Sequence, residues 1–208
     1  ERGFNMGKVL GVYLMPHPPI IIPEVGRRER WGAGKTIEAM ETVAREISKK
    51  RPDTIITISP HGPIFSDGIG IMSQPRLKGD FSRFGARKPS LQFNSNGSLI
   101  ERIIHEAKLS DLLAIELDET MCRAYNVSSS LDWGALVPLY FVNQFYDNFK
   151  LVAMGSSQLP SHMLYNFGIA MRKAIESSDE DVIVIASGDL SHRLKEDGPY
   201  GYHPAGVE

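Results

Sequence analysis

Short apolar runs alternate with longer amphipathic segments along the chain, and the alternation predicts strands and helices in turn. Apolar or β-branched runs predict buried strands over Val9–Met15, Thr54–Ser59, Phe149–Met154 and Val182–Ala186. Apolar residues at helical spacing predict helices over Lys35–Lys50, Ser98–Leu109, Trp133–Tyr146 and Ser161–Glu176. This order indicates an α/β fold with a central, mainly parallel or mixed sheet flanked by helices.

Proline and glycine mark the connections between these elements. Four prolines predict a rigid, extended loop over Pro16–Pro23, and the next strand ends in a turn at Pro60–Pro63. The Gly-rich segment Gly68–Pro89 is expected to form short strands or an excursion at one edge, and Lys195–Glu208 is expected to be a loop.

Two helix starts carry capping signals. Ser98 with Glu101 three residues later fits a capping box. Asp132 is expected to cap the following helix, with Pro138 near its first turn.

Composition narrows the class of protein. The chain has 208 residues, 42% hydrophobic and 23% charged, which is typical of one soluble globular domain. A net charge of −2 provides no basic field for nucleic acid or an anionic membrane. The single Cys122 excludes an intrachain disulfide and favours a cytoplasmic setting, and no apolar run reaches the length of a membrane span.

Histidines follow three of the predicted strands. His17, His61 and His192 each come soon after a strand, and His203 lies in the turn-rich tail. Functional groups of open α/β sheets collect beyond the carboxyl ends of the strands, and imidazole is the commonest protein metal ligand. Each histidine alone is equally well explained by an ordinary surface turn, but the set predicts a metal site with a proton-transfer group beside it.

Two carboxylates extend this prediction. Asp189 lies between a strand and His192, where it could fix the tautomer of a histidine, although an Asx-turn explains it as well. Glu208 is a candidate metal ligand, and two histidines with one carboxylate are typical of non-haem Fe(II) sites.

Five blocks in order resemble the class III extradiol ring-cleavage dioxygenases, the LigB-like catalytic subunit, and within them the AmmeMemoRadiSam or Memo-like branch. They are Pro16–Pro19, Ser59–Pro63, Leu131–Leu139, Gly188–His192 and Pro204–Glu208. The resemblance implies the LigB-like fold, with a phosphorylase/hydrolase-like architecture, and a small phenolic substrate together with O₂.

The resemblance also implies roles for single residues. Fe(II) would be held by His17, His61 and Glu208, and His192 would be the acid–base group. Apart from the resemblance, Trp133, Tyr125 and His203 are expected to line the substrate pocket, although a solvated turn explains His203 equally well.

Trp133 stands where many dioxygenases of this class have histidine, and an indole cannot relay a proton near neutral pH. This departure keeps open a second function, a non-catalytic Memo-like scaffold that binds a ligand or peptide. A third is a zinc hydrolase that uses the same three ligands with an open water position.

The expected domain is a single unit over residues 6–208 that is incomplete at its C-terminus, since the family continues beyond this glutamate and this branch often carries a second C-terminal domain. Residues 1–5, ahead of Met6, are expected to be a cloning remnant. The sequence does not determine the oligomeric state, and a homo-oligomer is one of the alternatives.

Overall fold

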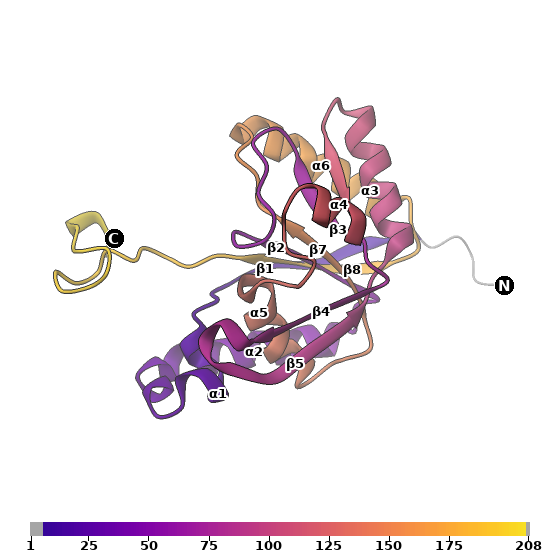
Figure 1. Cartoon of the computed structure of the whole chain (residues 1–208). Helices are drawn as coiled ribbons and strands as arrows, with labels where there is room; N and C mark the ends of the chain where they lie inside the picture. The colour runs from indigo at the N-terminus through magenta and orange to yellow at the C-terminus, as the bar shows by residue number, and fades with distance from the viewer. Residues whose placement is uncertain (1–5, 207–208) are drawn as a thin grey trace.

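A mixed sheet of six strands forms the centre of the structure, a computed structural model that describes residues 6–206 (Figure 1). The spatial order is β1-β8-β2-β7-β3-β6, with bounds Lys8–Met15 (β1), Asp181–Ser187 (β8), Thr54–Ser59 (β2), Lys150–Gly155 (β7), Ile69–Met72 (β3) and Ala114–Leu117 (β6). The first four strands run parallel, while β3 runs antiparallel to β7 and parallel to β6. The carboxyl ends of β1, β8 and β2 therefore meet at one edge of the sheet. The predicted α/β fold with a mixed sheet flanked by helices is confirmed.

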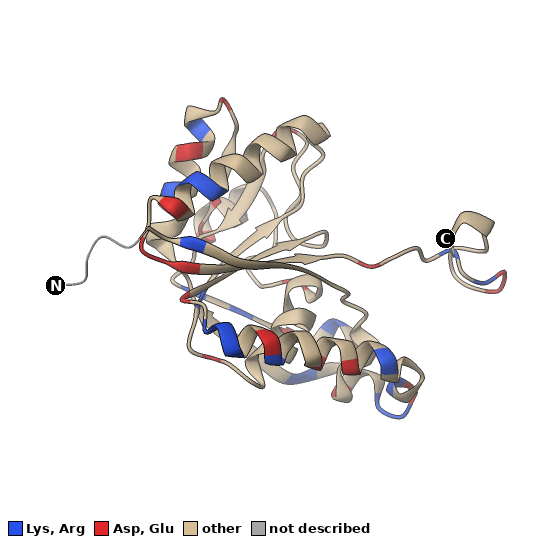
Figure 2. Cartoon of the chain, turned by 180° about the vertical axis from the view of Figure 1, so that it is seen from behind, with Lys and Arg blue, Asp and Glu red and all other residues tan. Residues whose placement is uncertain are grey.

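Helices cover both faces of the sheet (Figure 1). α2 (Gly34–Lys50) and α5 (Trp133–Asn143) pack together on one face, and α3 (Gly97–Leu109) and α6 (Ser161–Glu176) pack together on the other. Two short helices, α1 (Pro23–Gly26) and α4 (Glu119–Ala124), lie in connections. Charged residues follow α2, α3 and α6 on the outside of the molecule, whereas the strands between them are mostly uncharged (Figure 2).

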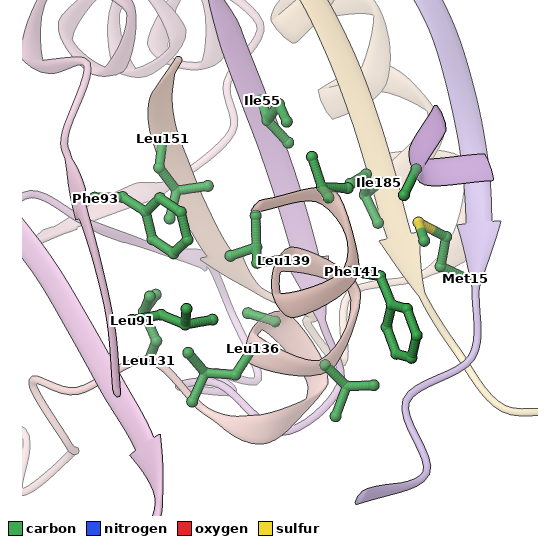
Figure 3. Packing of buried hydrophobic residues seen from close by; sticks show 14 of the residues in the cluster. Met15, Ile55, Leu91, Phe93, Leu131, Leu136, Leu139, Phe141, Leu151 and Ile185 are labelled. Atoms are coloured by element: carbon green, nitrogen blue, oxygen red, sulfur yellow. The ribbon is translucent and has the colours of Figure 1, made fainter. Parts of the chain in front are cut away.

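α5 is the most deeply buried helix. Its residues are apolar on all sides, and eight of its eleven are buried. Figure 3 shows Leu136, Leu139 and Phe141 of this helix among side chains of the six-stranded sheet, of β5 (Ala86–Asn94) and of the segment just before α5. The surrounding residues are Met15, Ile55, Leu91, Phe93, Leu131, Leu151 and Ile185. Because α5 is enclosed, the position of its N-terminus is fixed against the edge where β2 and β8 end.

A two-stranded antiparallel hairpin packs against α5, and its second strand also contacts β7 of the sheet. It consists of β4 (Arg76–Phe81) and β5 (Ala86–Asn94). Leu77 and Phe81 are fully buried in the same core cluster as α5, which anchors the hairpin. This hairpin and β3 account for the predicted short strands between Gly68 and Pro89.

The structure corrects several details of the sequence prediction. α3 begins at Gly97, and its cap is Asn96, whose side chain accepts a hydrogen bond from the Leu99 backbone N–H, so the predicted Ser98 capping box is wrong. Asp132 caps α5 as predicted, but this helix ends at Asn143, and Pro138 is its sixth residue, beyond the first turn. The predicted loop Pro16–Pro23 contains a 3₁₀ turn.

The last described residues form a tail that extends away from the sheet in both views (Figures 1 and 2). The tail is mostly irregular, with a 3₁₀ turn over Pro204–Gly206. No helix within residues 6–206 is long and apolar enough to cross a bilayer.

Candidate metal centre

Three neighbouring parallel strands each present a polar residue at the second position beyond their last residue. β1 ends at Met15 and leads to His17, while β2 ends at Ser59 and leads to His61. β8 lies between them, ends at Ser187 and leads to Asp189. Equal spacing on adjacent parallel strands brings all three side chains to one edge, where α/β proteins build their sites.

The two imidazoles meet through the same ring atom. Nε2 of His17 lies 3.0 Å from Nε2 of His61, and the two rings are almost perpendicular. His17 is 3% exposed, whereas His61 opens to solvent on one side. Burial lowers the pKa of His17, and burial together with the neighbouring His17 lowers the pKa of His61. Both rings are therefore neutral near pH 7, and neutral imidazole is the form that binds metals.

Asp189 connects this pair to the third predicted histidine. Its Oδ1 accepts a hydrogen bond of 2.9 Å from the backbone N–H of His17. Its Oδ2 lies 3.5 Å from Nε2 of His17 and 3.5 Å from Nε2 of His192. The carboxylate therefore stands between the buried imidazole and His192, which is exposed and lies beside Tyr200.

Two serines at strand ends tie the histidine loops to the N-terminus of α5. Ser187 Oγ lies 2.8 Å from Nδ1 of His17 and donates a hydrogen bond of 2.6 Å to the Gly134 carbonyl. Ser59 Oγ donates to Asp132 Oδ1 and accepts from the backbone N–H of His61. A Cβ at Gly134 would collide with Ser59 Oγ, which shows how closely β2 approaches this helix.

An open cleft of about 580 Å³ begins at His61 and runs between the β4–β5 hairpin and the segment before α5. Trp133 lines it, with its ring stacked on His61 at 4.0 Å between centroids. The guanidinium of Arg83 lies over the same indole at 4.7 Å, and Phe84 meets it edge-on. Lys78 also lines the cleft. The cleft therefore joins an aromatic platform to two cationic side chains beside an imidazole.

The remaining predicted site residues lie elsewhere. Tyr125 is 47% exposed, contacts Phe65 edge-on and is not among the residues that line this cleft. His203 belongs to the projecting tail, where its backbone N–H donates to Arg193 and its Nδ1 accepts from Ala205. Glu208 lies outside the described residues.

The described part of the donor set fits a metal ion. Within residues 6–206 no three His, Cys, Asp or Glu side chains form a complete metal-binding group, but two neutral imidazoles converge. Two nitrogens bound at about 2.1 Å to one ion, at a right angle, lie about 3.0 Å apart. This matches the observed separation, and the Asp189 carboxylate beside Nε2 of His17 adds negative charge where a cation would sit.

Sequence reasoning did not find Ser59, Ser187 or Arg83. The two serines carry a usable signal, since Ser59 is the last residue of a predicted strand, Ser187 directly follows another, and both strands lead to candidate site residues. Arg83 carries none, because its approach to Trp133 depends on how the hairpin packs against α5.

Comparison with known proteins shows which family the chain belongs to. The family model of the catalytic LigB subunit of aromatic ring-opening dioxygenase matches residues 11–208. The chain belongs to this family, as the sequence blocks predicted.

Among the individual relatives, one is named as a dioxygenase and one as a MEMO1 family protein. The chain is 42% identical over 196 residues to Protein CA_C1420 of Clostridium acetobutylicum, covering 94% of this chain and 42% of that protein. It is 25% identical over 201 residues to a 3,4-dihydroxyphenylacetate 2,3-dioxygenase of Escherichia coli, covering 92% and 69%. It is 26% identical over 152 residues to MEMO1 family protein MTH_45 of Methanothermobacter thermautotrophicus, covering 73% and 47%. The chain thus spans less than half of two of these relatives.

Proposed function

We propose that this chain is a metal-dependent, extradiol-type dioxygenase that holds Fe(II) with His17, His61 and Glu208 and opens a phenolic ring with O₂. The observation that carries the proposal is the convergence of two neutral imidazoles, Nε2 to Nε2, at 3.0 Å beyond the ends of β1 and β2, the strands on either side of β8. Two histidines with one carboxylate leave open positions on the metal for a substrate.

When bound, the iron would supply Lewis-acid and redox chemistry for O₂ and the phenolic substrate. The protein itself holds the two imidazoles in place through the serines and α5. His17 is sealed from water at 3% exposure, while His61 faces the cleft, so substrate would approach from the side of His61.

His192 is the proposed acid–base group. Its side chain is exposed, so it can exchange a proton with substrate or water, and the Asp189 carboxylate 3.5 Å from its Nε2 would stabilise the imidazolium after proton uptake. Asp189 is itself fixed by the His17 backbone N–H. This pair could move a proton beside the metal without the participation of Trp133.

The cleft supports an aromatic diol with a short anionic arm as the substrate. Trp133 offers a flat surface beside His61, and the two acidic lining residues Asp80 and Asp132 already accept hydrogen bonds from within the chain. Among residues 6–206, Arg83 and Lys78 form no ion pair with an acidic side chain. A planar guanidinium with free N–H groups matches a carboxylate. The name of the Escherichia coli relative specifies a substrate of this kind.

The test is anaerobic titration with Fe(II), followed by measurement of O₂ uptake with a panel of catechols. We expect one tight iron site, and uptake with 3,4-dihydroxyphenylacetate or a close analogue. His17→Ala and His61→Ala should each abolish tight iron binding, whereas His105→Ala, an exposed histidine on α3, should not. Iron binding that survives both site variants, or bound iron with no O₂ uptake on any diol, would contradict the proposal.

One observation favours a second function, a non-catalytic scaffold. Trp133 stacks directly on His61, where it can provide apolar contact but no titrating group. A chain that binds ligands in the cleft, takes up no iron and consumes no O₂ would select this function. Zinc found in the purified protein, with ester or amide hydrolysis and no oxygen reaction, would instead select a hydrolase.

A further inference from the structure

A hydrogen-bond relay reaches the candidate metal centre from inside α5, and it starts at a proline. In an α-helix the carbonyl of residue i accepts from the N–H of residue i+4. Gly134 and Pro138 have this spacing within α5, and proline has no N–H. The Gly134 carbonyl therefore lacks its helical donor, and in this buried position it needs another.

Ser187 supplies that donor. Its Oγ lies 2.6 Å from the Gly134 oxygen, and since a carbonyl only accepts, the single hydroxyl proton must point to it. The same Oγ lies 2.8 Å from Nδ1 of His17. With its proton committed to Gly134, the hydroxyl can only accept at this second contact, so the hydrogen between the two atoms belongs to Nδ1 of His17.

The consequence falls on the other nitrogen of the ring. A neutral imidazole with its proton on Nδ1 has a free lone pair on Nε2, the atom that faces His61. Asp189 works against this arrangement, because its Oδ2 lies 3.5 Å from Nε2 and would attract a proton there. Without Ser187, the acceptors around Nε2 would favour the opposite tautomer, in which the lone pair faces away from His61.

We propose that Ser187 and Pro138 are positioning residues that set the tautomer of His17 and so present its Nε2 lone pair at the site before any metal arrives. Pro138 leaves the Gly134 carbonyl free, the carbonyl takes the Ser187 proton, and Ser187 takes the Nδ1–H of His17. The value of this tautomer for metal binding rests on the proposed function, but the tautomer itself belongs to the metal-free protein. Partners of this kind typically change metal affinity by about 10- to 100-fold.

The experiment is ¹⁵N–¹H correlation spectroscopy of the imidazole rings in metal-free protein labelled at histidine, because ring ¹⁵N shifts distinguish the two neutral tautomers. We expect the wild type to show His17 protonated at Nδ1, and Ser187→Ala to shift it towards Nε2–H. Ser187→Thr, which keeps the hydroxyl, should restore the wild-type spectrum. Ser59→Ala is the matched control, because Ser59 also ends a strand and binds the α5 N-terminus but contacts no ring nitrogen.

Two further measurements complete the test. Pro138→Ala supplies an N–H that competes for the Gly134 carbonyl, so its His17 signal should fall between those of wild type and Ser187→Ala. Anaerobic Fe(II) titration should show affinity weakened by about 10- to 100-fold in Ser187→Ala. Wild-type protein with His17 protonated at Nε2, or Ser187→Ala with an unchanged tautomer, would overturn the proposal even if iron binds. An unchanged tautomer in Pro138→Ala would remove the role of the proline. Failure to bind iron with the expected tautomers would count against the proposed function and leave this inference standing.

Discussion

Replacing Arg83 with Gln should reduce the affinity of the protein for an acidic diol while leaving a neutral diol almost unaffected. Arg83 is held over Trp133 at 4.7 Å, so its guanidinium lies beside the aromatic platform on which a ring would rest. Hydrogen bonds to charged groups contribute about 1.5–3 kcal/mol. Because Arg83 is exposed and screened by solvent, we take the lower end, about 1.5 kcal/mol, which is slightly more than tenfold in Kd.

The assay compares the Kd of 3,4-dihydroxyphenylacetate with that of 4-methylcatechol in anaerobic, Fe(II)-loaded protein. Arg83→Lys should fall between wild type and Arg83→Gln, because lysine keeps the charge but loses the planar fork. The difference should shrink at high salt, as expected for a solvent-exposed ion pair. Arg87→Gln is the control, because Arg87 is also exposed and belongs to the same hairpin but does not line the cleft. An equal loss for both diols, or an equal effect of Arg87→Gln, would refute the reasoning.

Three further outcomes follow from the site. Burial lowers the pKa of His17 and His61, so the affinity for Fe(II) should be constant above about pH 6.5 and fall only at lower pH. The free energy of unfolding should decline below the same pH, because the unfolded chain binds these protons first. An affinity for Fe(II) that already declines between pH 8 and 7 would contradict this. Asp132→Ala removes the cap of α5 and the acceptor of Ser59, so urea unfolding should show a loss of about 2–4 kcal/mol, with Asp132→Asn losing less than half of that. Fe(II) at 100 times its Kd should stabilise the protein by about 2.7 kcal/mol, an increment that His17→Ala should abolish and His105→Ala should retain.

The strands and helices that position the site follow directly from sequence periodicity. β2 spans Thr54–Ser59 and α6 spans Ser161–Glu176, the ranges that β-branched alternation and helical spacing predict. The sequence pattern predicts no element over residues 110–131, although they contain β6 and α4. A strand of four residues and a helix of six are too short for either period to be recognised, and their type is decided by pairing with β3 and packing around Cys122.

In the candidate site, too, local features can be predicted from the sequence, whereas features that depend on the order of the strands cannot. That His17 and His61 follow strands is visible in the sequence, and parallel strands place such residues at one edge. That β8 lies between β1 and β2 is not visible, because sheet order is set by how helices cover the two faces of the sheet. Ser187 acquires its role only through this order, which places it against both His17 and the N-terminus of α5. Pro138 is a second example. The sequence predicts that the carbonyl of Gly134, four residues earlier, loses its helical donor, but only the packing of the sheet determines that the Ser187 hydroxyl replaces this donor. The two candidate histidine ligands can thus be recognised from strand ends alone, whereas the residues that orient them depend on which elements become neighbours.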